Sequence, residues 1–271
     1  SYQRYKFIKS KLMEDMILAI LQARFSSSRL PGKVLKPILS KPMLLHQIER
    51  IQNSKRIDKL VVATSTEKSD DDIEKMCLDY NIEVFRGSLD NVLDRFYQCA
   101  KLYNPEYVVR LTGDCPLADW QVIDQTIQCH IKGKYDYVNN RSKPAFPDGL
   151  DVEVITYSAL KSACDNAVLP SEKEHVTLYV RHRKDKFKLG YFYSVKDLSH
   201  MRWTVDEPED FILVEKIYKN LYKNNPKFLM KDVLELLNNQ PELLKINSHI
   251  GTSEGMKKSL KEDEEFIKNE L

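Results

Sequence analysis

The sequence predicts an α/β protein with an open, mostly parallel sheet and helices on both of its faces, a three-layer architecture. Short runs of β-branched and other apolar residues alternate with longer amphipathic stretches, which is the pattern of βαβ units. Each strand-and-helix unit takes about 25 to 40 residues, the usual size of such a unit. With 271 residues, of which 42% are hydrophobic and 30% charged, the chain can also bury one large core.

The first half of the chain supplies four strands and the helices that cover them. The strands are expected at short apolar runs, which are Ile17–Leu21, Lys59–Thr64, Ile82–Phe85 and Tyr107–Leu111. The helices are expected where apolar residues recur at spacings of three and four, because such a helix presents one apolar face to a sheet. These segments are Met43–Gln52, Asp71–Tyr80 and Leu89–Tyr103.

The pattern changes after Leu111. A helix is expected at Trp120–Ile131, followed by short strands at Tyr135–Asn139 and Val152–Ile155. Residues from about 133 to 200 therefore predict a small inserted subdomain that covers the mouth of a site or builds a dimer contact.

Two helix starts are marked in the rest of the chain. The letters SEKE at Ser171–Glu174 predict a capping box, and the helix that follows would carry His175 and Tyr179 one turn apart on one face. A last strand is expected at Met201–Val205, before a helix that Pro208 opens.

The two ends of the chain lack the periodicity of the middle. Residues 1–15 are polar and basic and are expected to be an N-terminal appendage. Residues 16–255 are expected to form the main domain, and residues 256–271 a charged, helical tail.

The composition excludes several classes of protein. The 42 Lys and Arg against 40 Asp and Glu leave a net charge of +2, which predicts no attraction to nucleic acid or to an anionic membrane. The longest apolar run near the start, Met16–Leu21, is far shorter than the ~20 residues of a membrane span. Five cysteines without a Cys-x-x-Cys pair predict a reduced, cytoplasmic protein without structural zinc. A small charged ligand remains as the expected partner.

The loop after the first strand has the content of a polyphosphate site. Arg24, Arg29 and Lys33 lie within ten residues, with serines between them and a Pro31-Gly32 turn that lets the backbone approach a ligand. Ligands of open α/β sheets bind beyond the carboxyl ends of the strands, where this loop begins. The chain contains neither GxxxxGK[ST] nor GxGxxG, so neither a P-loop nor a common dinucleotide site is expected.

This loop, QARFSSSRLPGK, resembles the signature of the cytidylyltransferases that activate sugar acids, the CMP-Kdo and CMP-acylneuraminate synthetases. The resemblance is greatest to the SpsF-type branch of spore-coat polysaccharide synthesis. Further motifs follow in the same order along the chain: VVATST at 61–66, VFRGSLDNVLDRF at 84–96, VVRLTGDCPL at 108–117, PDGLDVEV at 147–154, EHVTLYVR at 174–181 and MRWTVDEPED at 201–210. The likeness covers the chain from about Met16 to about Gly255.

The resemblance implies a fold of the nucleotide-diphospho-sugar-transferase type and a Mg²⁺-dependent transfer of CMP from CTP to a sugar acid or related acceptor. It also implies a homodimer and makes residues 16–255 a cytidylyltransferase-like catalytic domain. In this family pattern the catalytic positions fall on Arg24, Lys33, Asp114 and Asp206. The two aspartates match the metal-binding carboxylates.

The resemblance also assigns the residues that bind the two substrates. The nucleotide-binding positions are Gln22, Ala23, Arg24, Ser27, Arg29 and Lys33 in the loop, with Arg86, Ser88 and Asn91 for cytosine and ribose. The acceptor positions are His175 and Tyr179, an H-x-x-x-Y pair, with Asn139, Asp148, Asp151 and Arg202 as weaker candidates. Trp203 is expected in the core, and Cys115 as a small buried residue without a catalytic role.

Other interpretations stay open at the level of sequence. A glycosyltransferase with a nucleotide-sugar donor uses the same fold, but it needs a D-x-D motif at a strand end, and the only such spacing is Asp70–Asp72 at a helix start. A non-catalytic scaffold of a sugar pathway is the second alternative. Single residues also have structural interpretations, with Ser88 and Asp206 as helix caps.

Overall fold

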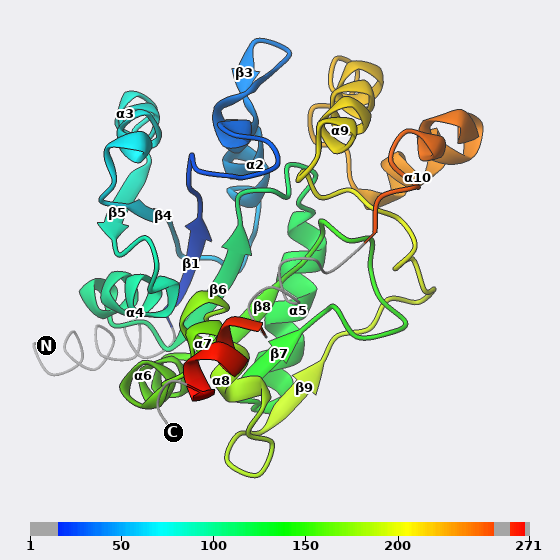
Figure 1. Ribbon diagram of the computed structural model, residues 1–271. Coiled ribbons are helices and arrows are strands. Elements are labelled where there is room, and N and C mark those ends of the chain that lie inside the picture. Colours follow the sequence, from blue (N-terminus) through cyan, green and yellow to red (C-terminus); the bar gives the residue numbers. More distant parts are fainter. Residues whose placement is uncertain (1–15, 252–260, 269–271) are drawn as a thin grey trace, which may run out of the picture.

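The computed structural model describes residues 16–251 and 261–268, and its centre is a mixed sheet of seven strands in the order β5-β4-β1-β6-β8-β7-β9 (Figure 1). β1, β4, β5 and β6 are parallel, β8 runs antiparallel to β6 and β7, and β9 is parallel to β7. The strands are β1 Ile17–Gln22, β4 Lys59–Ser65, β5 Glu83–Gly87, β6 Tyr107–Thr112, β7 Tyr137–Asn139, β8 Glu153–Thr156 and β9 Leu189–Tyr191. A small hairpin joins β2 Pro37–Ile38 to β3 Lys41–Pro42.

Helices cover both faces of this sheet, so the predicted three-layer α/β fold is confirmed. On β1 the side chains alternate: Ile17, Ala19 and Leu21 join one core, and Leu18 and Ile20 join the other. The first core includes residues of α2 Met43–Ile51, α3 Asp71–Asp79, α5 Trp120–Gly133, α9 Pro208–Leu221 and α10 Met230–Asn239. The second core includes residues of α4 Val92–Tyr103, α6 Tyr157–Asn166 and α8 Leu178–Arg181.

The remaining elements are short. A five-residue helix, α7 Pro170–Glu174, precedes α8, and three 3-10 turns are η1 Lys33–Leu35, η2 Lys68–Asp70 and η3 Pro241–Lys245. Pro208 opens α9, as the sequence predicts. Helix α4 begins at Val92 because the Asn91 side chain accepts a hydrogen bond from the backbone N–H of Asp94, so Asn91 and not Ser88 is its cap.

Two predicted elements are wrong. Met201–Val205 is not a strand, because it forms only an isolated bridge between Arg202 and Asp148. The helix expected from Ser171 onward is broken into α7 and α8, since Val176 between them has a φ of 40°. Ser171 itself lies inside α7, and Glu172 accepts hydrogen bonds from the backbone N–H groups of residues 168 and 169.

Two terminal predictions have different outcomes. Residues 261–268 form a helix, as the tail was expected to, and this helix lies beside α7 (Figure 1), where Asp263 accepts hydrogen bonds from the backbone and hydroxyl of Ser171. The expected appendage, 1–15, lies outside the described residues. Within the described segments no helix is both long and apolar enough to span a bilayer. The inserted region contributes β7, β8 and β9, which extend the main sheet.

Candidate active site

A cavity of about 280 Å³ opens at the carboxyl ends of β1 and β6. The loop after β1 forms one wall, and the residues that follow β6 form the floor next to it. The predicted site residues that line it are Gln22, Ala23, Arg24, Ser27, Arg29, Lys33, Asp114, His175 and Asp206. The structure therefore brings together residues that are up to 184 positions apart in the chain, from 22 to 206.

Lys33 is a buried cation of this cavity, with 8% of its surface exposed. Its Nζ donates to the backbone oxygen of Val205 at 2.7 Å and to Asp206 Oδ1 at 2.8 Å, and it lies 4.0 Å from Asp114 Oδ2. The turn before it needs Gly32, whose φ is 69° and where a Cβ atom would come within 2.9 Å of the Phe25 ring. The local sequence PGK thus directs the ammonium group between two carboxylates.

Asp114 follows β6 directly after Thr112-Gly113, as the sequence predicts. Burial alone would raise the pKa of Asp114, but the charge of Lys33 and hydrogen bonds from Thr112 and Cys115 lower it below its ordinary value. The neighbouring Cys115 is 4% exposed, and burial raises the pKa of its thiol well above the ordinary range. Cys115 is therefore an inert buried residue.

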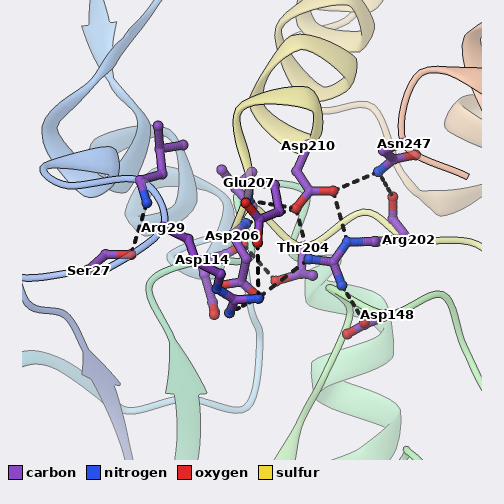
Figure 2. Close-up of polar contacts among 12 residues, drawn as sticks. Ser27, Arg29, Asp114, Asp148, Arg202, Thr204, Asp206, Glu207, Asp210 and Asn247 are labelled. Carbon is purple, nitrogen blue, oxygen red and sulfur yellow. Dashed lines mark hydrogen bonds and ion pairs between the residues drawn. The ribbon is translucent and has the colours of Figure 1, made fainter. Parts of the chain in front are cut away.

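Asp206 reaches the cavity because the segment before it is hydrogen-bonded to the end of β6. The backbone N–H of Val205 donates to the backbone oxygen of Asp114 at 2.8 Å. Asp206 also forms an ion pair with Arg29 at 3.1 Å (Figure 2). The convergence of Asp114 and Asp206 that the sequence suggested is present, although no sheet strand precedes Asp206.

Arg202 lies behind the cavity and does not line it. Its guanidinium forms a bidentate pair with the fully buried Asp210, with both N···O distances at 2.8 Å (Figure 2). Asp210 in turn accepts hydrogen bonds from the backbone N–H groups of Asp206 and Glu207 at 3.0 and 2.9 Å. The predicted acceptor contact of Arg202 is thus replaced by a role in orienting the start of α9. Trp203, 1% exposed, lies in the core as expected.

His175 and Tyr179 do not share a helix face, which corrects that prediction. His175 follows the last residue of α7 and lines the cavity, whereas Tyr179 lies in α8 and is 5% exposed. The Tyr179 ring packs under the guanidinium of Arg183, 3.6 Å from the ring centre, and against Phe187. Burial lowers the pKa of His175, and the nearby charge of Arg110 lowers it further.

The residues predicted to read cytosine lie outside the cavity lining. Arg86 pairs with Asp71 and Glu74, both at 2.8 Å, and so ties β5 to α3. The Ser88 hydroxyl accepts from the backbone N–H of Asn91, and Asn91 caps α4. These contacts give all three residues a structural role.

Three weaker acceptor candidates gather outside the lining of the cavity as well. Asp151 pairs with Arg141 at 3.2 Å, and the Asn139 side chain accepts from the backbone N–H of Arg141 at 2.9 Å. Asp148 lies 3.7 Å from Arg202, and burial together with the charge of Asp151 raises the pKa of Asp148 to about 6.

Two cations that line the cavity were not predicted from the sequence. They are Arg95 of α4 and Arg110 of β6. Burial and the charges of Arg24 and Arg110 lower the pKa of Arg95 to about 10, which leaves it protonated at neutral pH. A signal was available for Arg110, since it is a charged residue in the apolar run of a predicted strand, where an unpaired charge is costly. Arg95 follows Asp94 on an amphipathic helix and gave no such signal.

The residues present fit a single hard cation. Among residues 16–251 and 261–268, no group of three or more His, Cys, Asp and Glu side chains is arranged to hold a metal ion. Mg²⁺, however, uses one or two carboxylates together with water and substrate phosphates. Asp114 and Asp206 both line the cavity, and the Lys33 ammonium between them shows that this position favours positive charge.

The family model described as cytidylyltransferase matches residues 18–245 of the chain. The chain belongs to the cytidylyltransferase family. It is therefore an enzyme of the nucleotidyltransferase class, and the resemblance read from its motifs is confirmed.

Named relatives and a solved structure are similar to this chain over different shares of its length. It is 34% identical to the spore coat polysaccharide biosynthesis protein SpsF of Bacillus subtilis, over 83% of this chain and 95% of that protein. It is 36% identical to the 3-deoxy-manno-octulosonate cytidylyltransferase of Geobacter sulfurreducens, over 41% of this chain and 44% of that protein. A solved cytidylyltransferase from Leptospira borgpetersenii superposes with a TM-score of 0.80 at 30% identity, over 89% of this chain and 99% of that one.

Proposed function

We propose that this cytidylyltransferase joins CMP from CTP to a sugar acid or related acceptor, with Mg²⁺ as cofactor and release of pyrophosphate, in the synthesis of a surface polysaccharide or glycan. Membership of the cytidylyltransferase family supports CTP as the nucleotide. The named activity of the Geobacter relative supports a sugar acid, and the name of the Bacillus relative supports the pathway class.

The observation that carries the proposal is the arrangement of charge at the carboxyl ends of β1 and β6. Arg24, Arg29 and Lys33 line one side of the cavity, and Asp114 and Asp206 lie against Lys33. Such a site can hold three linked phosphates by cations and still accommodate a divalent ion at the carboxylates.

The proposed reaction is a single displacement. An oxygen of the acceptor attacks the α-phosphorus of CTP, the bond between the α- and β-phosphates breaks, and pyrophosphate leaves. Arg24, Arg29 and Lys33 hold the β- and γ-phosphates and stabilise the charge that builds on the leaving group. His175, which lines the same cavity from the end of α7, contacts the acceptor.

Asp114 and Asp206 would hold the Mg²⁺ ion. When bound, the ion supplies charge neutralisation at the α-phosphate and lowers the pKa of the attacking hydroxyl. Lys33 then moves its ammonium from the carboxylates to the phosphates, because both interactions compete for the same three N–H donors. No covalent enzyme intermediate is needed, since placement and charge account for the catalysis.

The glycosyltransferase alternative requires a D-x-D motif in the site, and the positions of Asp70, Asp71 and Asp72 do not favour it. Asp70 is fully buried, accepts hydrogen bonds from Phe25 and Ser65, and lies outside the cavity lining with Asp71 and Asp72. The homodimer implied by the resemblance and the cytoplasmic location predicted from the cysteines remain part of the proposal, with CTP and the acceptor as partners and without nucleic acid or membrane.

The test of the proposed function measures pyrophosphate release. Each of the four nucleoside triphosphates is combined with sugar acids, sugar phosphates and plain hydroxy acids, with and without Mg²⁺. We expect release that requires CTP, Mg²⁺ and a sugar acid together. Equal release with UTP, or release with a nucleotide sugar as donor and none with CTP, contradicts the proposal.

A further inference from the structure

Two of the motifs meet in the sheet through residues that the proposed mechanism does not use. Arg110 lies in VVRLTGDCPL on β6, and Glu153 lies in PDGLDVEV on β8. The two are direct partners in the antiparallel register of these strands, and Arg110 Nη1 forms an ion pair with Glu153 Oε2. The pair is inside the molecule, since the side chains of Arg110 and Glu153 are 12% and 5% exposed.

Glu153 is held by more than its partner arginine. Its Oε1 accepts hydrogen bonds from the hydroxyls of Tyr137 and Thr177, the latter at 2.6 Å. Burial opposes ionisation, but Arg110, Arg181 and these hydrogen bonds together lower the pKa of Glu153 to about 2. Both carboxylate oxygens are therefore occupied, and the negative charge has a fixed position behind Arg110.

Arg110 is not fully used by this network. A guanidinium has five N–H donors. One of them binds Glu153, and Nη2 donates to Gln22 Oε1 at 3.0 Å. The buried Nε has no hydrogen-bond partner, and the residue lines the cavity. Burying a guanidinium costs desolvation energy, and this cost is offset better if Arg110 also binds an anionic ligand in the cavity.

The position of Arg110 indicates which part of the ligand it meets. It is hydrogen-bonded to Gln22, at the start of the loop proposed to hold the nucleotide. It also lines the same cavity as His175, the proposed acceptor residue, and its charge contributes to lowering the pKa of that imidazole. The two substrates of the proposed reaction react with each other at the α-phosphorus, so a residue between their binding regions lies against the α-phosphate.

We propose that Arg110 binds the α-phosphate of the nucleotide and that Glu153 is the positioning residue that fixes its guanidinium. This inference rests on the proposed function. It predicts a contact that CTP and CMP share and that cytidine lacks, in contrast to Lys33, which is proposed to meet the β- and γ-phosphates.

The test compares the affinities of CTP, CMP and cytidine by calorimetry in Arg110→Gln and Glu153→Gln. We expect Arg110→Gln to weaken CTP and CMP binding equally, by at least about tenfold, because a charge-assisted contact is lost. Cytidine affinity stays within about twofold of the wild-type value. Glu153→Gln is expected to lower the affinities for CTP and CMP as well, by a smaller factor. Glu153→Asp keeps the charge and is expected to retain part of the affinity that Glu153→Gln loses.

A second ion pair of the same kind provides the control. Glu172, with a side chain 2% exposed, pairs with Arg183 at 2.7 Å, and neither residue lines the cavity. Arg183→Gln and Glu172→Gln are expected to leave the ratio of CMP to cytidine affinity unchanged even where they lower the melting temperature.

Each other outcome overturns a defined part of the inference. Loss of CTP affinity alone would move Arg110 to the leaving group, and unchanged affinity for both nucleotides would remove it from nucleotide binding. An equal loss for cytidine, or the same ratio change in the control variants, would make the pair structural only. If Glu153→Gln does not fold, Arg110→Gln and Arg110→Lys still decide the contact. Failure of the wild type to bind CTP and CMP at all would instead refute the proposed function.

Discussion

At the scale of the residue, Lys33 has two sets of partners that compete for it. Its ammonium contacts Asp206 at 2.8 Å and lies 4.0 Å from Asp114, while its proposed ligands in the complex are the β- and γ-phosphates of CTP. We expect Lys33→Ala to weaken CTP binding much more than CMP binding, by about 1.5 to 3 kcal/mol, since one charge-assisted contact is removed. Calorimetry with both nucleotides measures this difference.

Lys36 supplies the control for this change. It directly follows η1 in the same loop and is exposed. Its Nζ lies 4.4 Å from the centre of the Phe211 ring. Lys36→Ala should leave both affinities close to wild type. An equal loss of CTP and CMP affinity in Lys33→Ala would place this lysine away from the terminal phosphates.

The two aspartates beside Lys33 are expected to act as a unit. If Asp114 and Asp206 hold one Mg²⁺ ion, conversion of either to Asn removes a ligand and should abolish most Mg²⁺-dependent pyrophosphate release. Groups that act together lose activity non-additively, so the double variant should be little worse than the poorer single one. CTP is still expected to bind through Arg24 and Lys33.

A purely structural Asp206 would behave differently. Its carboxylate pairs with Lys33 and Arg29, and loss of these contacts alone would cost stability with near-normal turnover. An active Asp206→Asn enzyme, or additive losses in the double variant, would remove Asp206 from the metal site. Melting temperatures of the three variants separate the two effects.

At the scale of the element, the predictions succeeded where local pattern and burial agree. The strands β1, β4, β5 and β6 were predicted to within two residues, because each has an apolar run. On β1 and β4 this run is buried between the two cores, whereas β5 is a half-buried edge strand. The break at Val176 could not be predicted, since a β-branched residue at positive φ opposes its own propensity and is held there by the tertiary structure.

The same limit explains why some predicted site residues lie outside the cavity lining and why two cations of the lining were not predicted. The loop residues were identified because their chemistry is concentrated in one short segment. Arg86 lies outside the cavity lining and pairs with Asp71 and Glu74, which lie on a helix that only the folded sheet brings beside it. Its predicted contact with the nucleotide stays a prediction. Arg110 was not singled out although it interrupts an apolar run, because its partner Glu153 is 43 positions away and no local pattern shows that the two side chains meet.

Helix α5 carries a titratable residue that predicts how stability depends on pH. His130 is 1% exposed and packs edge-on against Tyr107, and burial lowers the pKa of His130 to about 4. Its ordinary value, 6.5, applies in the unfolded chain. Between these two values the unfolded state binds more protons than the folded state, so stability falls as pH falls through this window.

We therefore expect His130→Leu to reduce the loss of stability on acidification. The folded protein should lose up to about 3 kcal/mol from this group between about pH 6.5 and about pH 4, and the variant should lack that share. Urea unfolding at a series of pH values measures it. His200→Gln, at an exposed histidine, is the control. Identical pH profiles for His130→Leu and the wild type would show that His130 titrates normally.

At the scale of the whole molecule, the order of the strands and helices could be predicted from the sequence. The positions of the irregular segments around the site could not. The alternation of strands and helices predicts the parallel sheet, and the sheet places the loop after β1 beside the end of β6. Asp206, His175 and Arg202 reach that edge through irregular segments and not through strands. Their positions depend on long-range hydrogen bonds, such as that from Val205 to Asp114, which periodicity does not encode.

The helix formed by residues 261–268 is held by hydrogen bonds of the same long-range kind. Asp263, 8% exposed, accepts hydrogen bonds from the backbone N–H and hydroxyl of Ser171 at 2.9 and 2.5 Å. α7 ends at Glu174, and both Glu174 and the next residue, His175, line the cavity. The C-terminal helix is therefore expected to support the acceptor side of the site from outside.

We expect Asp263→Ala to lower the free energy of unfolding by about 1 to 2 kcal/mol, because both hydrogen bonds that Ser171 donates lose their acceptor. CTP affinity should stay at the wild-type value, since Asp263 contacts α7 and not the nucleotide loop, while the KM for the acceptor rises as His175 loses its support. Glu264→Gln, at the exposed neighbouring position, is the control and should change none of these quantities.

A variant that keeps full stability would show that this helix does not dock on α7 in solution. A variant that loses stability and CTP affinity together would show that the C-terminal helix supports the nucleotide half as well, and that the two halves of the site are not independent.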